Sequence, residues 1–247
     1  WLWKNLHSSG GTGVKTQKIL NNDYPGGYLQ KIIEGNPISV FFLADQFFID
    51  VFGFCQINSF KFEDTPYLFN GLKGPIVLER EITEKVFLIL KVLTKEFNLI
   101  GLSGLDFIIS ERKVYVLEIN SRPTAALEIF EEYFKCSISN LHCKVANKKT
   151  INNNKITRFF SREIKTRNLC CSKVIYAKRD INLKPIFFEK IKLLPFCRDI
   201  PSSLNFQKGD PILSIFVKET SSEKLENLIS KNFEEVLSLI DNTSITT

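Results

Sequence analysis

The chain has 247 residues, of which 44% are hydrophobic, and this is enough for a buried core in one large domain or two small ones. No run of uncharged apolar residues is long enough to cross a bilayer, so the sequence predicts no transmembrane helix. The net charge is +6, but Lys and Arg are spread along the whole chain. This distribution argues against nucleic acid as the partner and suits a small anionic substrate.

The cysteines and histidines form no metal-ligand pattern. Six Cys and two His occur without C-x-x-C spacing, so a structural zinc site is not expected. Cys170 and Cys171 are adjacent and poorly placed to bridge each other. These features predict reduced, mostly buried thiols in a cytoplasmic protein. The chain begins with Trp1 and contains no Met, which indicates a fragment that lacks its N-terminus.

The N-terminal segment combines a lysine with a glycine-rich turn. Residues 1–3 are expected to end a short strand, Lys4 follows directly, and residues 8–13 read SSGGTG. Glycines let backbone N–H groups approach an anion without interference from a Cβ atom, and such turns cradle phosphates. The P-loop and G-x-G-x-x-G spacings are both missing. A phosphate-binding turn and a plain surface turn are both open at this point.

The middle of the chain predicts an antiparallel meander followed by a helix. A turn at residues 35–37 precedes a strand at 38–44, which should pair with residues 47–54 across Asp45 and Gln46. Residues 55–76 are rich in aromatic residues and contain Gly71, Gly74 and Pro75 as breakers, so they are expected to be irregular. Apolar residues then recur at helical spacing and predict an amphipathic helix at 81–97.

Residues 105–127 carry the clearest chemical signal. Two apolar, β-branched runs flank a polar turn at 110–113, which predicts a hairpin with a loop longer than the minimum. Glu118, Asn120 and Arg122 alternate on the second arm, so an extended chain points all three to one face. The first arm carries Asp106.

Two carboxylates and an amide oxygen would converge beside one guanidinium if Asp106 lies opposite this row. Oxygen-only donors suit a hard cation such as Mg²⁺, which keeps some waters and bridges to substrate phosphates. The forked donors of Arg122 suit phosphate or carboxylate. The alternative is an edge hairpin whose polar end is merely solvated.

The C-terminal part predicts short strands and a final helix. Helices are expected at residues 125–134 and 137–145, followed by a polar, Asn-rich linker. Beyond the linker the sequence predicts three strands, at residues 173–177, 186–191 and 212–217. Thr220 and Glu223 form a capping box for a terminal helix with an apolar stripe.

These pieces, in this order, resemble the ATP-grasp superfamily. The shared features are a lysine ending a strand ahead of a glycine-rich turn, and an acidic residue followed a dozen positions later by E-x-N-x-R-P. The run LEINSRPTAALE is most similar to carboxylate–amine ligases related to biotin carboxylase. These include the predicted ligases of the one-carbon cofactor pathways of methylotrophs and methanogens.

The resemblance implies an α+β fold in two domains. The first, at residues 1–148, is an ATP-grasp domain, an antiparallel sheet with helices packed on one side. A linker at 149–155 leads to a small β-rich domain that ends in a helix, at 156–247. The N-terminal α/β domain that usually precedes the lysine would be missing from this chain.

The resemblance also implies roles for individual residues. Asp106, Glu118 and Asn120 fall on the positions that hold Mg²⁺, with two ions expected and Mn²⁺ as an alternative. Arg122 falls on the position that contacts phosphate or the acyl phosphate. The positions that contact ATP are Lys4, Ser9, Gly10, Gly11, Gly13, Gln30, Lys31 and Ile33.

Within that set the contacts differ in kind. Lys4 would contact the α- and β-phosphates, while the C=O of Lys31 and the N–H of Ile33 would read the adenine edge. Gln30 replaces an acidic residue common at this position, and its amide oxygen can still accept from the adenine amino group.

The implied activity is ATP-dependent ligation of a carboxylate to an amine in cofactor biosynthesis, through an acyl phosphate, with release of ADP and phosphate. Lys4 and Arg122 are catalytic in this scheme. The partners would be a small carboxylic acid and an amine, with no nucleic acid and no membrane, and a homo-oligomer stays open. The alternatives are another ATP-grasp chemistry, such as a biotin-carboxylase-like or purine-pathway step, and a non-catalytic nucleotide-binding protein.

Overall fold

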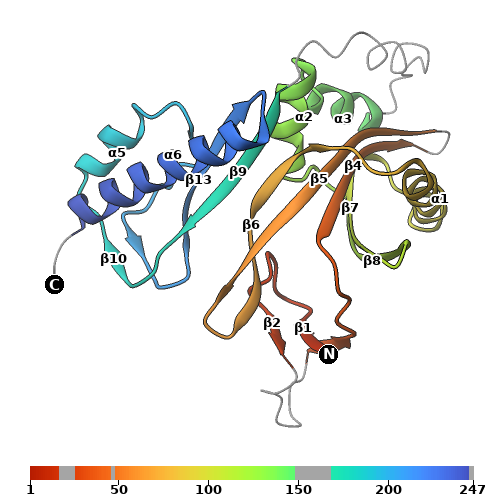
Figure 1. The fold of residues 1–247 in the computed structure, drawn as a ribbon, viewed down its shortest axis with the longest axis horizontal. Helices are drawn as coiled ribbons and strands as arrows, with labels where there is room; N and C mark the ends of the chain where they lie inside the picture. The colour runs from red at the N-terminus through yellow and green to blue at the C-terminus, as the bar shows by residue number, and fades with distance from the viewer. Residues whose placement is uncertain (17–25, 46–47, 148–167, 245–247) are drawn as a thin grey trace. The chain divides into compact units, whose positions relative to one another are not determined.

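The computed structural model describes residues 1–16, 26–45, 48–147 and 168–244 (Figure 1). Contacts divide the chain into two units, each assembled from separated stretches. The first unit comprises Trp1–Ile32, Asn58–Gly71 and Cys171–Thr247, and the second comprises Ile33–Ile57 and Leu72–Cys170. The predicted linker at 149–155 lies outside the described residues, so the division into domains 1–148 and 156–247 stays a prediction. None of the described helices has the length and apolar character needed to cross a membrane.

The second unit is built on an antiparallel sheet. Its strands are adjacent in the order β6-β5-β4-β7-β8, and β4 pairs antiparallel with both β5 and β7, as β7 does with β8. The strands are β4 (Pro37–Asp45), β5 (Phe48–Phe62), β6 (Thr65–Ile76), β7 (Gly101–Ser110) and β8 (Lys113–Asn120). The part of the β5–β6 hairpin from Asn58 to Gly71 belongs to the first unit. The helices of this unit are α1 (Arg80–Glu96), α2 (Ala126–Phe134) and α3 (Ser139–Ala146).

Helices cover both faces of this sheet. Adjacent residues of a strand point to opposite faces, and Phe41 and Phe42 of β4 are both fully buried. Phe42 belongs to the apolar cluster formed with α1, whereas Phe41 stacks on Phe130 of α2 with ring centroids 5.9 Å apart. The antiparallel sheet with helices is therefore as expected, but α2 lies on the face opposite α1 rather than beside it. The unbroken apolar run of β4 is the sequence signature of burial on both faces.

Residues 55–76 are not irregular, and that prediction was wrong. They form most of a long hairpin in which β5 and β6 join at Glu63 and Asp64. The aromatic residues favour strands, and the glycines do not all break them. Gly71 has a φ of 96°, and a Cβ there would lie 2.0 Å from the carbonyl oxygen of Ser172, so this glycine permits a close approach of two backbones within the first unit.

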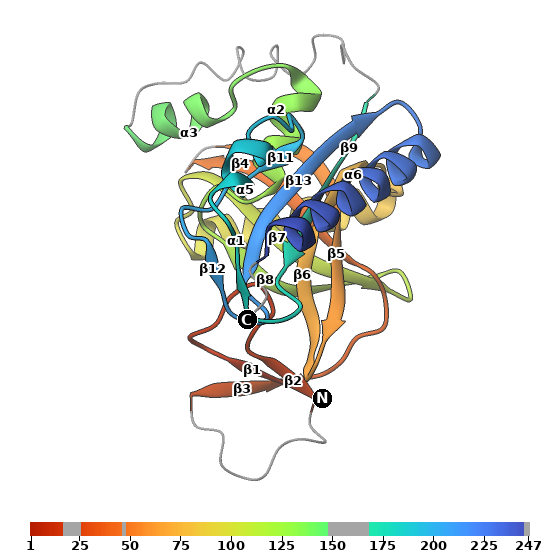
Figure 2. The same cartoon turned by 90° about the vertical axis from the view of Figure 1, so that its left-hand side faces the viewer.

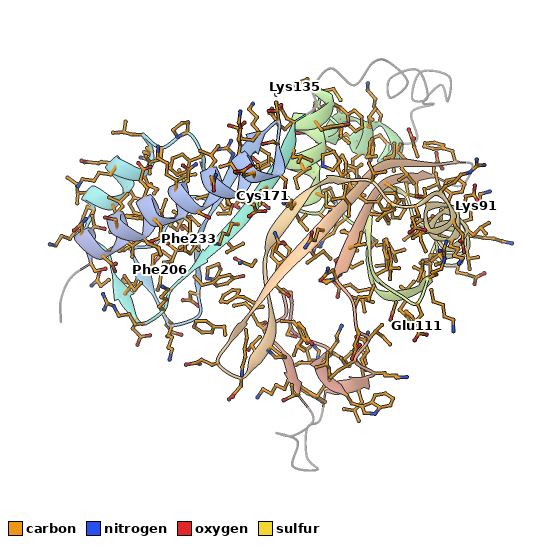
Figure 3. All side chains as sticks on the ribbon, in the orientation of Figure 1. Lys91, Glu111, Lys135, Cys171, Phe206 and Phe233 are labelled. Atoms are coloured by element: carbon orange, nitrogen blue, oxygen red, sulfur yellow. The ribbon has the colours of Figure 1, made fainter. Side chains whose placement is uncertain are left out.

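The β7–β8 turn is tighter than the sequence predicted. Only Glu111 and Arg112 lie between the strands, with φ values of 48° and 59°, as a two-residue turn with both residues left-handed requires. Glu111 marks this turn in Figure 3. Arg112 Nη2 donates to Glu81 Oε2 at 2.6 Å and to Glu79 Oε2 at 3.2 Å, so ion pairs to the start of α1 anchor a turn that lacks the usual Asn-Gly.

The first unit contains a small antiparallel sheet with strand order β2-β1-β3. Its strands are β1 (Leu2–Asn5), β2 (Val14–Thr16) and β3 (Gly27–Gln30). The remaining strands are β9 (Leu169–Tyr176), β10 (Ile181–Asn182), β11 (Cys197–Arg198), β12 (Asn205–Phe206) and β13 (Pro211–Glu219). Helix α6 (Ser222–Thr243) lies along β13, as Figures 1 and 2 both show.

Two further predictions in this unit were wrong. Ile186–Ile191, expected as a strand, is helix α5, because Phe187 and Ile191 are both fully buried and their spacing of four residues is helical. The terminal helix is capped by Ser221, whose hydroxyl accepts from the N–H of Lys224 at 3.3 Å, so the predicted capping box starting at Thr220 is not formed. The apolar stripe of that helix is buried as predicted.

Candidate nucleotide and metal site

Polar side chains from three adjacent strands of the second unit share one face of its sheet. Asp106 of β7 lies opposite Ser39 of β4 on one side and opposite Glu118 of β8 on the other. Residues that lie opposite each other in an antiparallel pair project to the same face. Asn120 is two residues beyond Glu118 and so projects to that face as well. The structure thus brings together the three residues expected to hold a cation.

A β-bulge creates the pairing of the two carboxyls. Asp106 pairs with Glu118, whereas the next residue, Phe107, pairs with Val116, so Leu117 is an extra residue in β8. In a regular ladder Leu117 would lie opposite Asp106, and Glu118 would point to the other face. Bulges commonly re-aim a side chain near a functional site, and this one places both carboxyls together.

The Asp106 carboxyl is hard to ionise. Burial raises its pKa to about 6; the hydrogen bond to Ser39 works against this rise, Glu118 adds to it, and the positive charge of Arg122 opposes it. The Asp106 and Glu118 side chains are within hydrogen-bond reach of each other, while Glu118 is exposed. A bound divalent cation would relieve both the desolvation and the repulsion between the carboxylates.

Arg122 follows β8, and its guanidinium turns back toward the same row. Nη2 donates to Asn120 Oδ1 at 3.4 Å, and Nη1 donates to the carbonyl oxygen of Pro123 at 3.2 Å. Asn120 Nδ2 in turn donates to Glu118 Oε1 at 3.3 Å. These contacts are long and exposed, so a ligand can replace them at little cost.

Sequence reasoning missed two residues that shape this end of the hairpin. Ser39 is 3% exposed, and a single hydroxyl in an otherwise apolar run was the signal that could have found it. Gly104 lies opposite Asn120, and a Cβ there would lie 2.7 Å from Thr124 Cγ2. The glycine therefore allows the chain beyond Arg122 to pack against β7.

The first unit carries most of the predicted ATP contacts. Lys4 of β1 lies opposite Tyr28 of β3, and Leu2 lies opposite Gln30, so Lys4, Tyr28 and Gln30 share one face of the small sheet. Gln30 Oε1 is buried with no hydrogen-bond partner among the described residues. A buried amide oxygen without a donor is costly, and an adenine amino group would satisfy it. Sequence reasoning did not single out Tyr28. Its place beside Lys4 becomes visible only in the pairing of β1 with β3.

The glycine-rich turn is held against β6 within the same unit. The N–H of Phe69 donates to the C=O of Gly10 at 2.9 Å. A Cβ at Gly11, whose φ is 85°, would lie 1.9 Å from the carbonyl oxygen of Tyr67, and one at Gly13 would lie 2.0 Å from Ser8 Oγ. These two glycines are therefore required by packing, whatever they contact in addition.

The other residues predicted to contact ATP are less constrained by packing. Ser9 and Gly10 are exposed, and a Cβ at Gly10 would meet nothing within 4 Å. Lys31 and Ile33 follow β3 in a stretch that belongs to no strand, so the sheet does not use their backbone groups. Their proposed contacts with adenine stay a prediction, as do the roles of all the residues above.

The donor set of the hairpin fits Mg²⁺. Among the residues that the structure describes, no group of three or more His, Cys, Asp or Glu side chains could hold a metal ion. Two carboxylates and one amide oxygen fall short of an all-protein cage. Mg²⁺ is commonly bound in this way, by one or two carboxylates together with waters and substrate phosphates.

The described residues form an α+β fold with a large antiparallel sheet. The model of the ATP-grasp domain matches residues 1–126, about half of the chain. The chain belongs to the ATP-grasp family.

The matching relatives are longer than this chain. An uncharacterized protein of Methanocaldococcus jannaschii is 24% identical over 246 residues, which cover 95% of this chain and 54% of the relative. The chain therefore spans about half the length of that relative.

Solved structures share the fold at low sequence identity. Carboxyaminoimidazole ribonucleotide synthase from Aspergillus clavatus, complexed with ATP, superimposes with a TM-score of 0.69 and 13% identity, covering 98% of this chain and 62% of that one. L-amino acid ligase from Bacillus licheniformis gives a TM-score of 0.63 and 13% identity, covering 87% and 55%.

Proposed function

We propose that this chain is the ATP-grasp part of a ligase that joins a carboxylate to an amine and releases ADP and phosphate. The observation that supports it most is the pairing of Asp106 with Glu118 beside Asn120 and Arg122. A bulge sets this pairing, and burial raises the pKa of Asp106 to about 6. Such an arrangement destabilises a merely structural hairpin, and perturbed groups of this kind cluster at functional sites.

The cation would be held by Asp106, Glu118 and Asn120. We propose two Mg²⁺ ions, with Mn²⁺ as the alternative. When bound, Mg²⁺ neutralises the β- and γ-phosphates of ATP and orients the γ-phosphoryl group for in-line transfer. Arg122 would leave its long contact with Asn120 and stabilise charge on the transferred group, which its planar fork suits.

The nucleotide would be held by the residues of the small sheet and the glycine-rich turn. Lys4 would neutralise the α- and β-phosphates, and the backbone N–H groups of the exposed residues Ser9 and Gly10 would donate to phosphate oxygens. Gln30 would accept from the adenine amino group, beside the backbone of Lys31 and Ile33. Gly11 and Gly13 would contribute by keeping the turn close to β6.

The chemistry then needs positioning rather than a protein nucleophile. A carboxylate oxygen attacks the γ-phosphorus, the bond to the β–γ bridging oxygen breaks, and ADP leaves with that electron pair. The amine nitrogen attacks the acyl carbon, phosphate leaves, and the amine gives up a proton to water or buffer. Closure of the turn over ATP would keep water away from the acyl phosphate.

We also propose a cytoplasmic setting and a role in cofactor biosynthesis. Four of the six cysteines are buried, which accords with thiols kept reduced in the cytoplasm. The acid and the amine would be small molecules. The likeness to a carboxyaminoimidazole ribonucleotide synthase supports carboxylation chemistry as the second candidate, so bicarbonate belongs among the acids to be tested.

The test is ADP release by the full natural protein against a panel of carboxylic acids, with and without amines such as glutamate. Hydroxylamine is added to trap the acyl phosphate as a hydroxamate. A ligase releases ADP only with its acid and yields the hydroxamate. ADP release with bicarbonate alone would identify the second candidate, and tight ATP binding without ADP release under any condition would indicate a non-catalytic protein. Glu118→Ala should abolish turnover while leaving the circular dichroism spectrum unchanged.

A further inference from the structure

The backbone of Phe69 on β6 links two segments of the first unit that are far apart in the sequence. Its N–H donates to the C=O of Gly10 in the glycine-rich turn at 2.9 Å. Its C=O accepts from the hydroxyl of Tyr176 at 2.6 Å. All three residues belong to the first unit. Strand β9, which ends at Tyr176, is therefore joined to the N-terminal turn through one residue of β6.

Both contacts act on the same side of β6. The N–H and C=O of one strand residue point to one side, where in a hydrogen-bonded pair they serve a single partner residue. At Phe69 two partners divide these groups between them, the carbonyl of the turn and the hydroxyl of Tyr176. A change at either contact therefore alters the backbone that the other one uses.

The Tyr176 side chain is fixed well enough to hold this contact. It is half-buried, and its ring packs against Phe60 of β5 with centroids 5.6 Å apart. Burial raises the pKa of the Tyr176 phenol, so the hydroxyl keeps its proton and donates at neutral pH. The donor–acceptor distance of 2.6 Å lies at the short end of the range for such bonds.

The glycine-rich turn follows β6 closely enough to move with it. A Cβ at Gly11 would lie 1.9 Å from the carbonyl oxygen of Tyr67, so the two backbones are in contact beside Phe69. Within the turn, the N–H of Thr12 donates to the C=O of Ser9 at 3.2 Å. A turn that is bonded internally and packed on a strand takes its position from that strand.

We propose that Tyr176 is a positioning residue for the glycine-rich turn: its hydroxyl holds Phe69, and Phe69 holds Gly10 where the turn can close on the phosphates of ATP. This inference rests on the nucleotide contacts proposed for Ser9 and Gly10. It gives the C-terminal strands a role in ATP binding, although none of the predicted nucleotide contacts lies in them. It does not depend on which acid and amine are joined.

The first test is amide hydrogen exchange at Phe69 in the full chain without nucleotide. Tyr176→Phe keeps the ring against Phe60 and removes only the hydroxyl. The bond from Phe69 to Gly10 should then open more often, and exchange at this amide should quicken roughly fivefold. Tyr67→Phe is the control, because it removes a hydroxyl from the same strand at a side chain that is 46% exposed, and it should leave this exchange unchanged.

The second test compares two ligands by calorimetry in the presence of Mg²⁺. Tyr176→Phe should raise the Kd for ATP roughly fivefold and that for adenosine by less than about twofold, because only the phosphates would meet the turn. A general loss of stability would weaken the binding of both ligands alike, so the ratio of the two effects separates positioning from a merely structural role.

A double substitution tests the route through the turn. Gly11→Ala should push the turn away from β6, because its Cβ would collide with the Tyr67 carbonyl, and ATP should bind more weakly. Adding Tyr176→Phe to that variant should weaken ATP binding by less than about a further twofold, since residues that act through one contact are not additive.

Four results would each overturn the proposal. They are unchanged exchange at Phe69 in Tyr176→Phe, unchanged ATP affinity in that variant, equal losses of ATP and adenosine affinity, and fully additive losses with Gly11→Ala. ATP binding that meets all these expectations without ADP release under any condition would support this inference and reject the proposed ligase. A parent chain that binds no ATP would overturn both.

Discussion

Asp50 and Asp106 are carboxyls of the second unit that burial affects alike and whose neighbours differ. Burial raises the pKa of each to about 6. Asp106 has Ser39, Glu118 and Arg122 within electrostatic or hydrogen-bond reach. Asp50, on β5, has one oxygen buried with no hydrogen-bond partner among the described residues. The comparison teaches that a raised pKa reports loss of water, whereas convergent donors are what indicate a site.

The largest expected effect is a difference in ATP turnover between variants of the two carboxyls. Asp106→Asn keeps the shape of the side chain but removes a charge that the proposed cation needs, so ADP release should fall by more than about 100-fold. Asp50→Asn is the matched control, because it makes the same change at a carboxyl without those neighbours, and it should alter turnover by less than about twofold. Steady-state ADP release by both variants decides this, and an equal loss in both would contradict the assignment of Asp106.

A smaller effect is expected from the residue that supports Asp106. The hydrogen bond from Ser39 lowers the pKa of Asp106, so Ser39→Ala should raise that pKa further and let protons compete better with the cation. Affinity for Mn²⁺ in the presence of ATP at neutral pH should fall roughly tenfold, as measured by calorimetry.

Ser103→Ala is the control for that substitution. Ser103 is equally buried on β7, and its hydroxyl has no hydrogen-bond partner among the described residues. Its removal should be neutral or slightly stabilising and should leave Mn²⁺ affinity unchanged. If both variants lose affinity equally, the Ser39 hydrogen bond is not the cause.

The smallest expected effect is on stability as a function of pH. Because the folded-state pKa of Asp50 is raised to about 6 from 3.8, the folded protein binds an extra proton between these values. That contribution to stability is present below about pH 4 and is lost as the pH rises through about 6.

Asp50→Asn removes this dependence. Without divalent cations, the stability of the variant relative to the parent should rise from pH 4 to pH 7 and stay constant above. The rise should be of the order of 1 kcal/mol, given the partial exposure of the carboxyl. The urea midpoints of the variant and the parent over this pH range measure the difference in stability. A difference that does not change with pH would mean that the Asp50 carboxyl is solvated in the folded protein. Asp106→Asn should change stability in the same direction, while differing in turnover.

Much of the candidate site could be predicted because its pattern is local. Glu118, Asn120 and Arg122 alternate in the sequence, and the structure places Glu118 and Asn120 on β8 with the guanidinium of Arg122 turned back onto Asn120. That Asp106 shares their face could not be read from alternation. It depends on the extra residue Leu117, and a register shift of one residue exchanges the faces of a strand. Ser39 was missed for the same reason, since its partner is 67 positions away along the chain.

The errors in the fold share a physical cause. Glycines and a proline in residues 55–76 indicated a loop, yet Gly71 sits inside β6 because another backbone passes close to it. Ile186–Ile191 is rich in strand formers, yet it is a helix whose buried residues are spaced by four. In both segments the packing partner decided between two conformations that local propensity left nearly equal in energy.

The sequence by itself determined the order of the motifs, the chemistry of the donors and the elements with strong periodicity, because each of these depends on residues close together in the chain. Only the tertiary structure decided which faces meet and which carboxyls lose their water. Those outcomes depend on the register of strands that are distant in sequence, and a single inserted residue in β8 is enough to change them.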